Sequence, residues 1–326
     1  MIHLFFCMFH LLVYTFLNYV KFPVSDGFCI LYRGVNIKMQ NNGFVKVLQW
    51  EKSDIEEKFG VSGGKYTDVN IGVTLFLGIA FTAFFYGLIF ALNEFIDIQA
   101  FPVFDMFFNR GFTPYAIAFF SCWSLSILFI KWRKLKLQKE ALTLMVVPQT
   151  AAFELTQETA RDILSRMYGL VDDPGHFVLL NRIERALANL RNIGMISDVS
   201  EVLRAQAQND EDHMESSYGI VRGFLWAIPV LGFIGTVLGL SRAIGSFGTV
   251  LIQSDGLDNL KASLQEITSG LSVAFDTTLL ALVFALSIQL IMVGLKKKEE
   301  SFLDECNDYC HANIISKLRL SQDILP

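Results

Sequence analysis

Four long apolar stretches dominate the pattern of hydrophobic and polar positions along the chain. They cover residues 71–92, 111–130, 224–244 and 271–295. At about 1.5 Å per residue, each can cross a hydrocarbon core of roughly 30 Å. A backbone in lipid must satisfy its own hydrogen bonds, and none of the stretches alternates every second residue, so we predict helices. The expected fold class is an all-α, polytopic membrane protein with four transmembrane helices and a cytoplasmic helical insertion.

Composition agrees with a membrane protein. Hydrophobic residues make up 52% of the chain, 30 residues are Phe, and only 18% are charged. The net charge of −5 argues against nucleic acid as a partner. Cys306, Cys310 and His311 follow helical spacing, which explains them without a metal. No convergent nucleophile or phosphate-binding loop is visible, so we expect neither an enzyme nor a cofactor.

Basic residues flank the second and fourth stretches on one side. Residues 131–139 contain five of them and residues 296–298 contain three, whereas the loops 93–114 and 247–270 carry one each. Basic flanks are retained in the cytoplasm, so both termini are expected there, in an inner-membrane protein. The segments predicted to be cytoplasmic are residues 39–70, a helical region at 131–221 and a C-terminal helix at 296–326.

The N-terminal stretch needs a separate interpretation. Residues 4–17 are apolar but short, no basic region precedes them, and no small-residue cleavage site follows. A more ordinary polar stretch begins at Met39. We therefore expect residues 1–38 to be a translated leader and Met39 to be the natural start.

The third and fourth stretches, within residues 222–295, each hold a threonine at comparable depth. Counting along the helices places Thr236 about 9 Å and Thr278 about 10 Å from the same edge of the hydrocarbon core. A hydroxyl both donates and accepts, so such a pair can hold water or exchange hydrogen bonds with a passing carboxyl group. In the alternative interpretation, each hydroxyl bonds to backbone of its own or a neighbouring helix.

Small residues predict how the third helix packs. Gly232, Gly235 and Gly239 recur at three- and four-residue steps, so they share one face and allow another backbone to approach closely. Pro229 lacks a backbone donor and is expected to bend the same helix.

Asp276 is the charged residue within the last stretch. A carboxylate at this depth is costly and usually functional. At 100° per residue it points about 200° away from Thr278, so both cannot face one narrow pore. Arg242, near the outer end of the third stretch, is the ion-pair partner suggested by the sequence. Direct proton handling by Asp276 is the alternative.

Two motifs carry a family resemblance. They are IPVLGFIGTVLGL at 228–240 and GLSVAFDTTLLAL at 270–282, in this order and followed by a lysine cluster. They resemble the MotA/TolQ/ExbB proton channel family, with wording closer to ExbB and TolQ and a four-span topology similar to MotA. By motif match, Thr236 and Thr278 correspond to the pore-lining threonines of the family, and Thr277 is a second candidate.

The resemblance implies a homopentamer around two copies of an ExbD/TolR/MotB-like single-span partner that bears a membrane aspartate. Proton motive force would then drive mechanical work or transport, as in a stator. One departure is Val273, which stands where ExbB and TolQ often carry a glutamate. A sodium-driven stator and a non-conducting scaffold that recruits cytoplasmic proteins are the alternatives. The downstream process, whether import, envelope maintenance, motility or defence, stays open.

Overall fold

A computed structural model describes residues 48–58, 60–61, 63–95, 106–108, 110–144, 146–148, 153–188, 190, 196–253 and 257–319. The expected leader and the start at Met39 lie outside these residues. Throughout the described part, the elements are helices and two isolated β-bridges, without a strand. This confirms the predicted all-α class.

Four of the helices are long and apolar enough to cross a membrane, as the sequence predicted. They are α4 (Ile71–Phe95), α6 (Thr113–Leu142), α10 (Gly219–Gln253) and α11 (Leu257–Asn313). The helix α10 continues through Pro229 as one element. The helix α11 has 57 residues and is therefore about 85 Å long, so it contains both the fourth predicted span and most of the predicted C-terminal helix.

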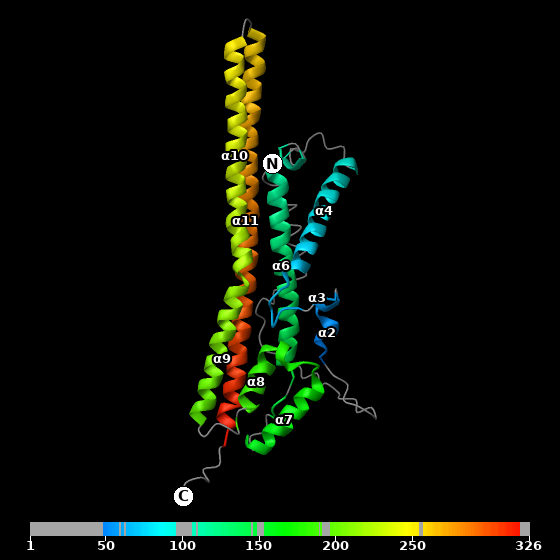
Figure 1. Cartoon of the computed structure of the whole chain (residues 1–326), viewed down its shortest axis with the longest axis vertical. Coiled ribbons are helices and arrows are strands. Elements are labelled where there is room, and N and C mark those ends of the chain that lie inside the picture. Colours follow the sequence, from blue (N-terminus) through cyan, green and yellow to red (C-terminus); the bar gives the residue numbers. More distant parts are fainter. Residues whose placement is uncertain are drawn as a thin grey trace, which may run out of the picture.

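The long helices lie in layers (Figure 1). The helices α10 and α11 form an antiparallel hairpin, α6 packs against both of them, and α4 packs against α6. The side chains of Phe76, Phe84 and Phe90 on α4 are exposed. An exposed apolar face of this kind fits a helix in contact with lipid.

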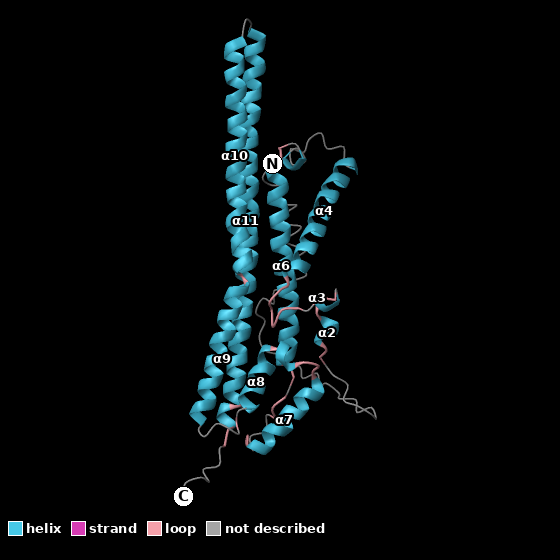
Figure 2. Ribbon diagram, viewed as in Figure 1, coloured by secondary structure: helices cyan, strands magenta, loops and turns pink. Residues whose placement is uncertain are grey.

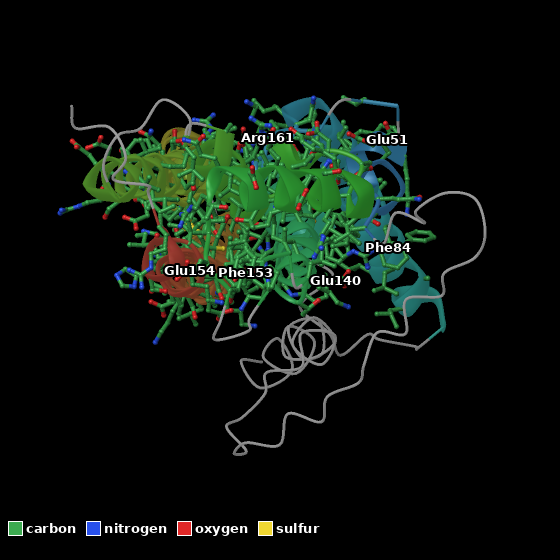
Figure 3. All side chains as sticks on the ribbon, turned by 90° about the horizontal axis from the view of Figure 1, so that it is seen from below. Glu51, Phe84, Glu140, Phe153, Glu154 and Arg161 are labelled. Atoms are coloured by element: carbon green, nitrogen blue, oxygen red, sulfur yellow. The ribbon has the colours of Figure 1, made fainter. Side chains whose placement is uncertain are left out.

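Shorter helices gather at one end of the long helices (Figure 2). They are α7 (Gln157–Leu170), α8 (Val178–Ala188) and α9 (Ile196–Ser217). A capping box between Thr156 and Thr159 fixes the start of α7. Exposed charged side chains of this end, such as Arg161, lie at its outer edge (Figure 3). A single turn residue, Tyr218, separates α9 from α10.

The chain before α4 and the chain after α11 are both tied to this helical end. The segment before α4 contains α2 (Trp50–Ser53) and α3 (Ile55–Lys58). Parallel β-bridges join Leu48 to Val171 and Leu155 to Leu318. The helical end therefore forms one packed unit with the lower parts of α6 and α11.

Candidate ion pathway and the charges that frame it

The hairpin closes along a glycine seam, formed by Gly232, Gly235 and Gly239. A Cβ atom added to Gly232 would lie 2.5 Å from Cβ of Ala281, and one added to Gly235 would lie 2.5 Å from Oγ1 of Thr277. Real Cβ atoms do not approach other atoms so closely, so side chains here would force the helices apart. The three glycines that the sequence placed on one face thus all face α11.

The three threonines differ in their hydrogen bonds. The Thr278 hydroxyl donates across the hairpin to the carbonyl oxygen of Gly232 at 3.1 Å. The hydroxyls of Thr277 and Thr236 donate to carbonyls of their own helices, at 3.0 and 2.6 Å. Thr277 is buried, while Thr236 and Thr278 are partly exposed. Each oxygen still has a lone pair with which it can accept a further hydrogen bond.

The pairing of the helices fixes the relative depth of these threonines. Gly232 faces Thr278, and Gly235 faces Thr277. Thr236 therefore lies two to four residues, or roughly 3 to 6 Å, farther than Thr278 from the end that carries α7 to α9. Among the described side chains, no hydrogen bond joins these two hydroxyls. They are two separate polar points near one level of the hairpin surface.

Thr113 is a residue that the sequence interpretation missed. It is the first residue of α6, it is buried, and its Oγ1 would lie 3.1 Å from a Cβ atom on Gly235. A third helix thus begins beside the glycine seam at the level of Thr277. The signal was Pro114 directly after it, because proline is common in the first turn of a helix.

The partner that the structure shows for Asp276 is Arg110, whereas the sequence suggested Arg242. The Arg110 guanidinium lies 3.1 Å from Oδ2 of Asp276, and Ser272 donates to the same oxygen at 3.4 Å. Because Thr277 faces Gly235, the backbone of Arg242 lies about six residues, or roughly 9 Å, beyond the level of Asp276. Its guanidinium lies near Gly111, where a Cβ atom would be 3.9 Å from Nη1 of Arg242. The turn before α6 brings Arg110 to the level of Asp276.

A second group of charges is buried where α6, α11 and the junction of α9 with α10 meet. Nζ of Lys131 lies 3.7 Å from Oε1 of Glu299, donates to Ser217 at 2.8 Å and lies 4.4 Å from the ring centre of Tyr218. The Tyr218 hydroxyl donates to the other Glu299 oxygen at 2.7 Å, and Thr67 also donates to Glu299. This network joins four separate segments of the chain.

Lys134, one turn along α6, binds the segment before α4. Its ammonium donates to Glu56 at 2.5 Å and to the carbonyl of Asp68 at 2.7 Å, and it lies 3.4 Å from a carboxylate oxygen of Asp54. The sequence interpretation used Lys131 and Lys134 only as basic flanks of a span. Their three-residue spacing places both on one helix face, which was the available signal.

No metal site emerges from the described part of the chain, where no three His, Cys, Asp or Glu side chains gather as ligands. Cys306 and Cys310 are both buried on α11. Burial of this kind is common for cysteines that pack as small apolar side chains.

The structure is that of a helical membrane protein. Its last two spans, α10 and α11, form a hairpin that is closely packed along the glycine seam and continues into the end that carries α7 to α9. Residues 178–307, from α8 to most of α11, match the model of the MotA/TolQ/ExbB proton channel family. The family suggested by the two motifs is therefore confirmed. Searches of curated proteins and of solved structures gave no match.

Proposed function

We propose that this protein is the proton-conducting inner-membrane subunit of a stator-type complex. In such a complex, proton motive force is coupled to mechanical work or transport through a single-span partner. The observation that carries the proposal is the family match across the hairpin, together with the partly exposed hydroxyls of Thr236 and Thr278 on it. We propose that both termini lie in the cytoplasm, because basic residues flank the second and fourth spans on that side.

The packing of one hairpin argues that the pathway lies between molecules. The glycine seam brings the backbones of α10 and α11 into contact, which leaves no room for water between them at Gly232, Gly235 and Gly239. A hollow of about 20 Å³, enough for roughly one water molecule, lies between α4, α6 and the start of α10 instead. A continuous pathway would therefore need the hairpins of several copies and the helix of a partner.

The outer surface of the hairpin suits such an assembly. Large apolar side chains, including Phe233, Phe275 and Leu286, are exposed on it, although α6 packs against the same hairpin. We propose a homopentamer around an ExbD/TolR/MotB-like partner with a membrane aspartate, and lipid around the outside. The partner is needed because the apolar stretches at 71–92, 111–130, 224–244 and 271–295 hold one carboxylate, Asp276, which is engaged by Arg110.

The hydroxyls can then assist proton transfer without titrating themselves. A protonated carboxyl group on the partner can donate to the Thr278 or Thr236 oxygen, because their own protons are already directed to backbone carbonyls. The buried Thr277 hydroxyl bonds within α11 and lies against Gly235, so we assign it to packing. Asp276 is assigned to its ion pair and not to proton transfer.

A flux assay with neighbouring threonines tests this proposal. The chain and its partner are reconstituted into vesicles, and a pH-sensitive dye reports flux under an imposed proton gradient. Thr278→Val is expected to lower the flux while native mass spectrometry shows an intact complex. Thr277→Val, an isosteric change at the adjacent residue, is the control and should leave the flux near that of the wild type.

The other outcomes separate the alternatives. Unchanged flux in Thr278→Val would remove this hydroxyl from the pathway. Flux that follows a sodium gradient instead of a proton gradient would identify a sodium-driven stator. An intact complex that conducts neither ion would support the scaffold.

A further inference from the structure

The hairpin continues well past the start of α6. Thr113, where α6 begins, lies beside Gly235, and Arg110 just before it pairs with Asp276. Beyond this level lie residues 236–253 of α10 and 257–276 of α11, which are 18 and 20 residues and about 27 and 30 Å long. Figure 1 shows this projecting hairpin rising beyond the ends of both α4 and α6.

In the outer half of this projecting hairpin, α11 does not have the composition of a membrane span. The first turns of α11 carry Asp258, Lys261 and Glu266 in the sequence. Charged side chains are costly in hydrocarbon, whereas α4 and the apolar part of α6 have the length that a bilayer requires. A bilayer that covers α4 and α6 therefore leaves the end of the hairpin outside.

An apolar stripe nevertheless continues onto this end. On α11 it runs along one helix face from Leu264 through Leu271, Phe275, Leu282 and Leu290 to Val293, and these side chains are 41% to 67% exposed. The stripe spans 30 residues, or about 45 Å, whereas the hydrocarbon core measures roughly 30 Å. Lipid tails alone cannot cover its full length, so its outer part requires contact with protein.

The neighbouring helix shows a matching surface. Val237, Leu240 and Ile244 on α10 recur at three- and four-residue steps and are exposed beyond the level of α6. Beyond the start of α6, the hairpin therefore exposes apolar side chains on both of its helices. A straight helical pair with this surface is complementary to another pair of the same kind and length.

We propose that the projecting hairpin packs against the projecting hairpins of neighbouring copies of this chain and forms a helical collar outside the membrane. The inference rests on the proposed homo-oligomer, because the apolar stripe runs without a break from the membrane onto the projecting hairpin. The copy that covers Leu282 and Leu290 within the membrane has a hairpin of equal length. It therefore also reaches Leu264 and Leu271.

Photo-crosslinking at two levels of one stripe tests the collar. A benzophenone amino acid is placed at Leu264, at Leu286 or, as a control on the exposed surface of α7, at Tyr168, in the full chain with its partner in native membranes. Light is expected to produce crosslinked dimers of this chain from positions 264 and 286. Position 168 should give at least tenfold less of this product.

The two levels distinguish failure of the collar from failure of the oligomer. Dimers from position 286 together with only lipid or partner adducts from position 264 would overturn the collar and leave the oligomer intact. No dimer from either position would overturn the proposed oligomer itself. As a second measurement, Leu264→Gln with Leu271→Gln should lower the fraction of oligomer that survives detergent extraction severalfold, whereas an unchanged fraction counts against the collar.

Discussion

Nζ of Lys131 lies 3.7 Å from Oε1 of Glu299, and both side chains are buried where α6 meets α11. Each charge has left water, so its cost is offset only by the other charge and by the surrounding hydrogen bonds. Those bonds come from Ser217, Tyr218 and Thr67. The pair therefore links the membrane helices to the α9–α10 junction and to the segment before α4.

Glu299→Gln should destabilise the folded protein by about 3–5 kcal/mol, because it leaves the Lys131 ammonium buried without its counter-charge. Thermal unfolding of the detergent-purified chain, followed by circular dichroism, measures the change. Replacing both partners, with Lys131→Met and Glu299→Leu, removes both buried charges and should recover most of the loss. Glu300→Gln is the control, because Glu300 is exposed. Equal stability of Glu299→Gln and wild type would show that the pair contributes little.

Two glycines of α10 make a matched pair for testing the hairpin contact. Gly235→Ala would place Cβ 2.5 Å from Oγ1 of Thr277, and overpacking of this kind typically costs about 1–3 kcal/mol. Gly223→Ala meets nothing within 4 Å, and alanine favours helix over glycine by about 0.5–1 kcal/mol. Thermal unfolding should therefore rank Gly223→Ala at or above wild type and Gly235→Ala below it. If Gly235→Ala were as stable as Gly223→Ala, the glycine seam would be looser than the geometry indicates.

The sequence predicted the parts of the structure that depend on local periodicity. The four spans follow from apolar length, and the glycine face follows from steps of three and four residues. The Thr236 and Thr278 levels were predicted as equal to within two to four residues, and the contacts along the glycine seam leave them two to four residues apart. This difference depends on the register between α10 and α11, which residue counting from uncertain span ends cannot fix.

Contacts between distant segments were not predictable in the same way. The partner of Asp276 is Arg110, 166 positions earlier, and it is placed by the turn before α6. The sequence showed Lys131 and Lys134 only as basic flanks of a span, because their acidic partners, Glu299 and Glu56, lie on other segments. A charge pattern along one chain shows how many basic residues flank a span, but not which of them are buried.

The Arg110–Asp276 pair is expected to hold the turn before α6 against the hairpin. Asp276→Asn and Arg110→Gln should each destabilise the protein modestly, and the double variant should lose less than the sum of the two. The coupling is expected to be about 1 kcal/mol, because both side chains retain some exposure. Thermal unfolding of the wild type, the two single variants and the double variant completes this double-mutant cycle. Strictly additive losses would mean that the two charges do not interact, and a loss of flux with unchanged stability would return Asp276 to the ion pathway.

Gln138 provides the last test, because its amide joins α6 to the start of α8. Its Nε2 donates to the carbonyl of His176 at 2.6 Å, and its Oε1 accepts from the backbone N–H of Val178 at 3.0 Å, with the side chain fully buried. Gln138→Leu preserves the volume but leaves two backbone groups without partners, each of which costs about 1–3 kcal/mol when buried. The exposed Lys136 on the same helix supplies the control Lys136→Leu, which should change stability by less than about 0.5 kcal/mol.

A local measurement separates this bond from a general loss of stability. Hydrogen exchange at the Val178 amide should accelerate in Gln138→Leu much more than exchange in the middle of α11, because only the first amide loses its acceptor. Uniform acceleration at both sites would mean that the variant loosens the whole protein. Protection of Val178 as in the wild type would show that water replaces the Gln138 oxygen, and that the α6–α8 contact depends on its apolar side chains.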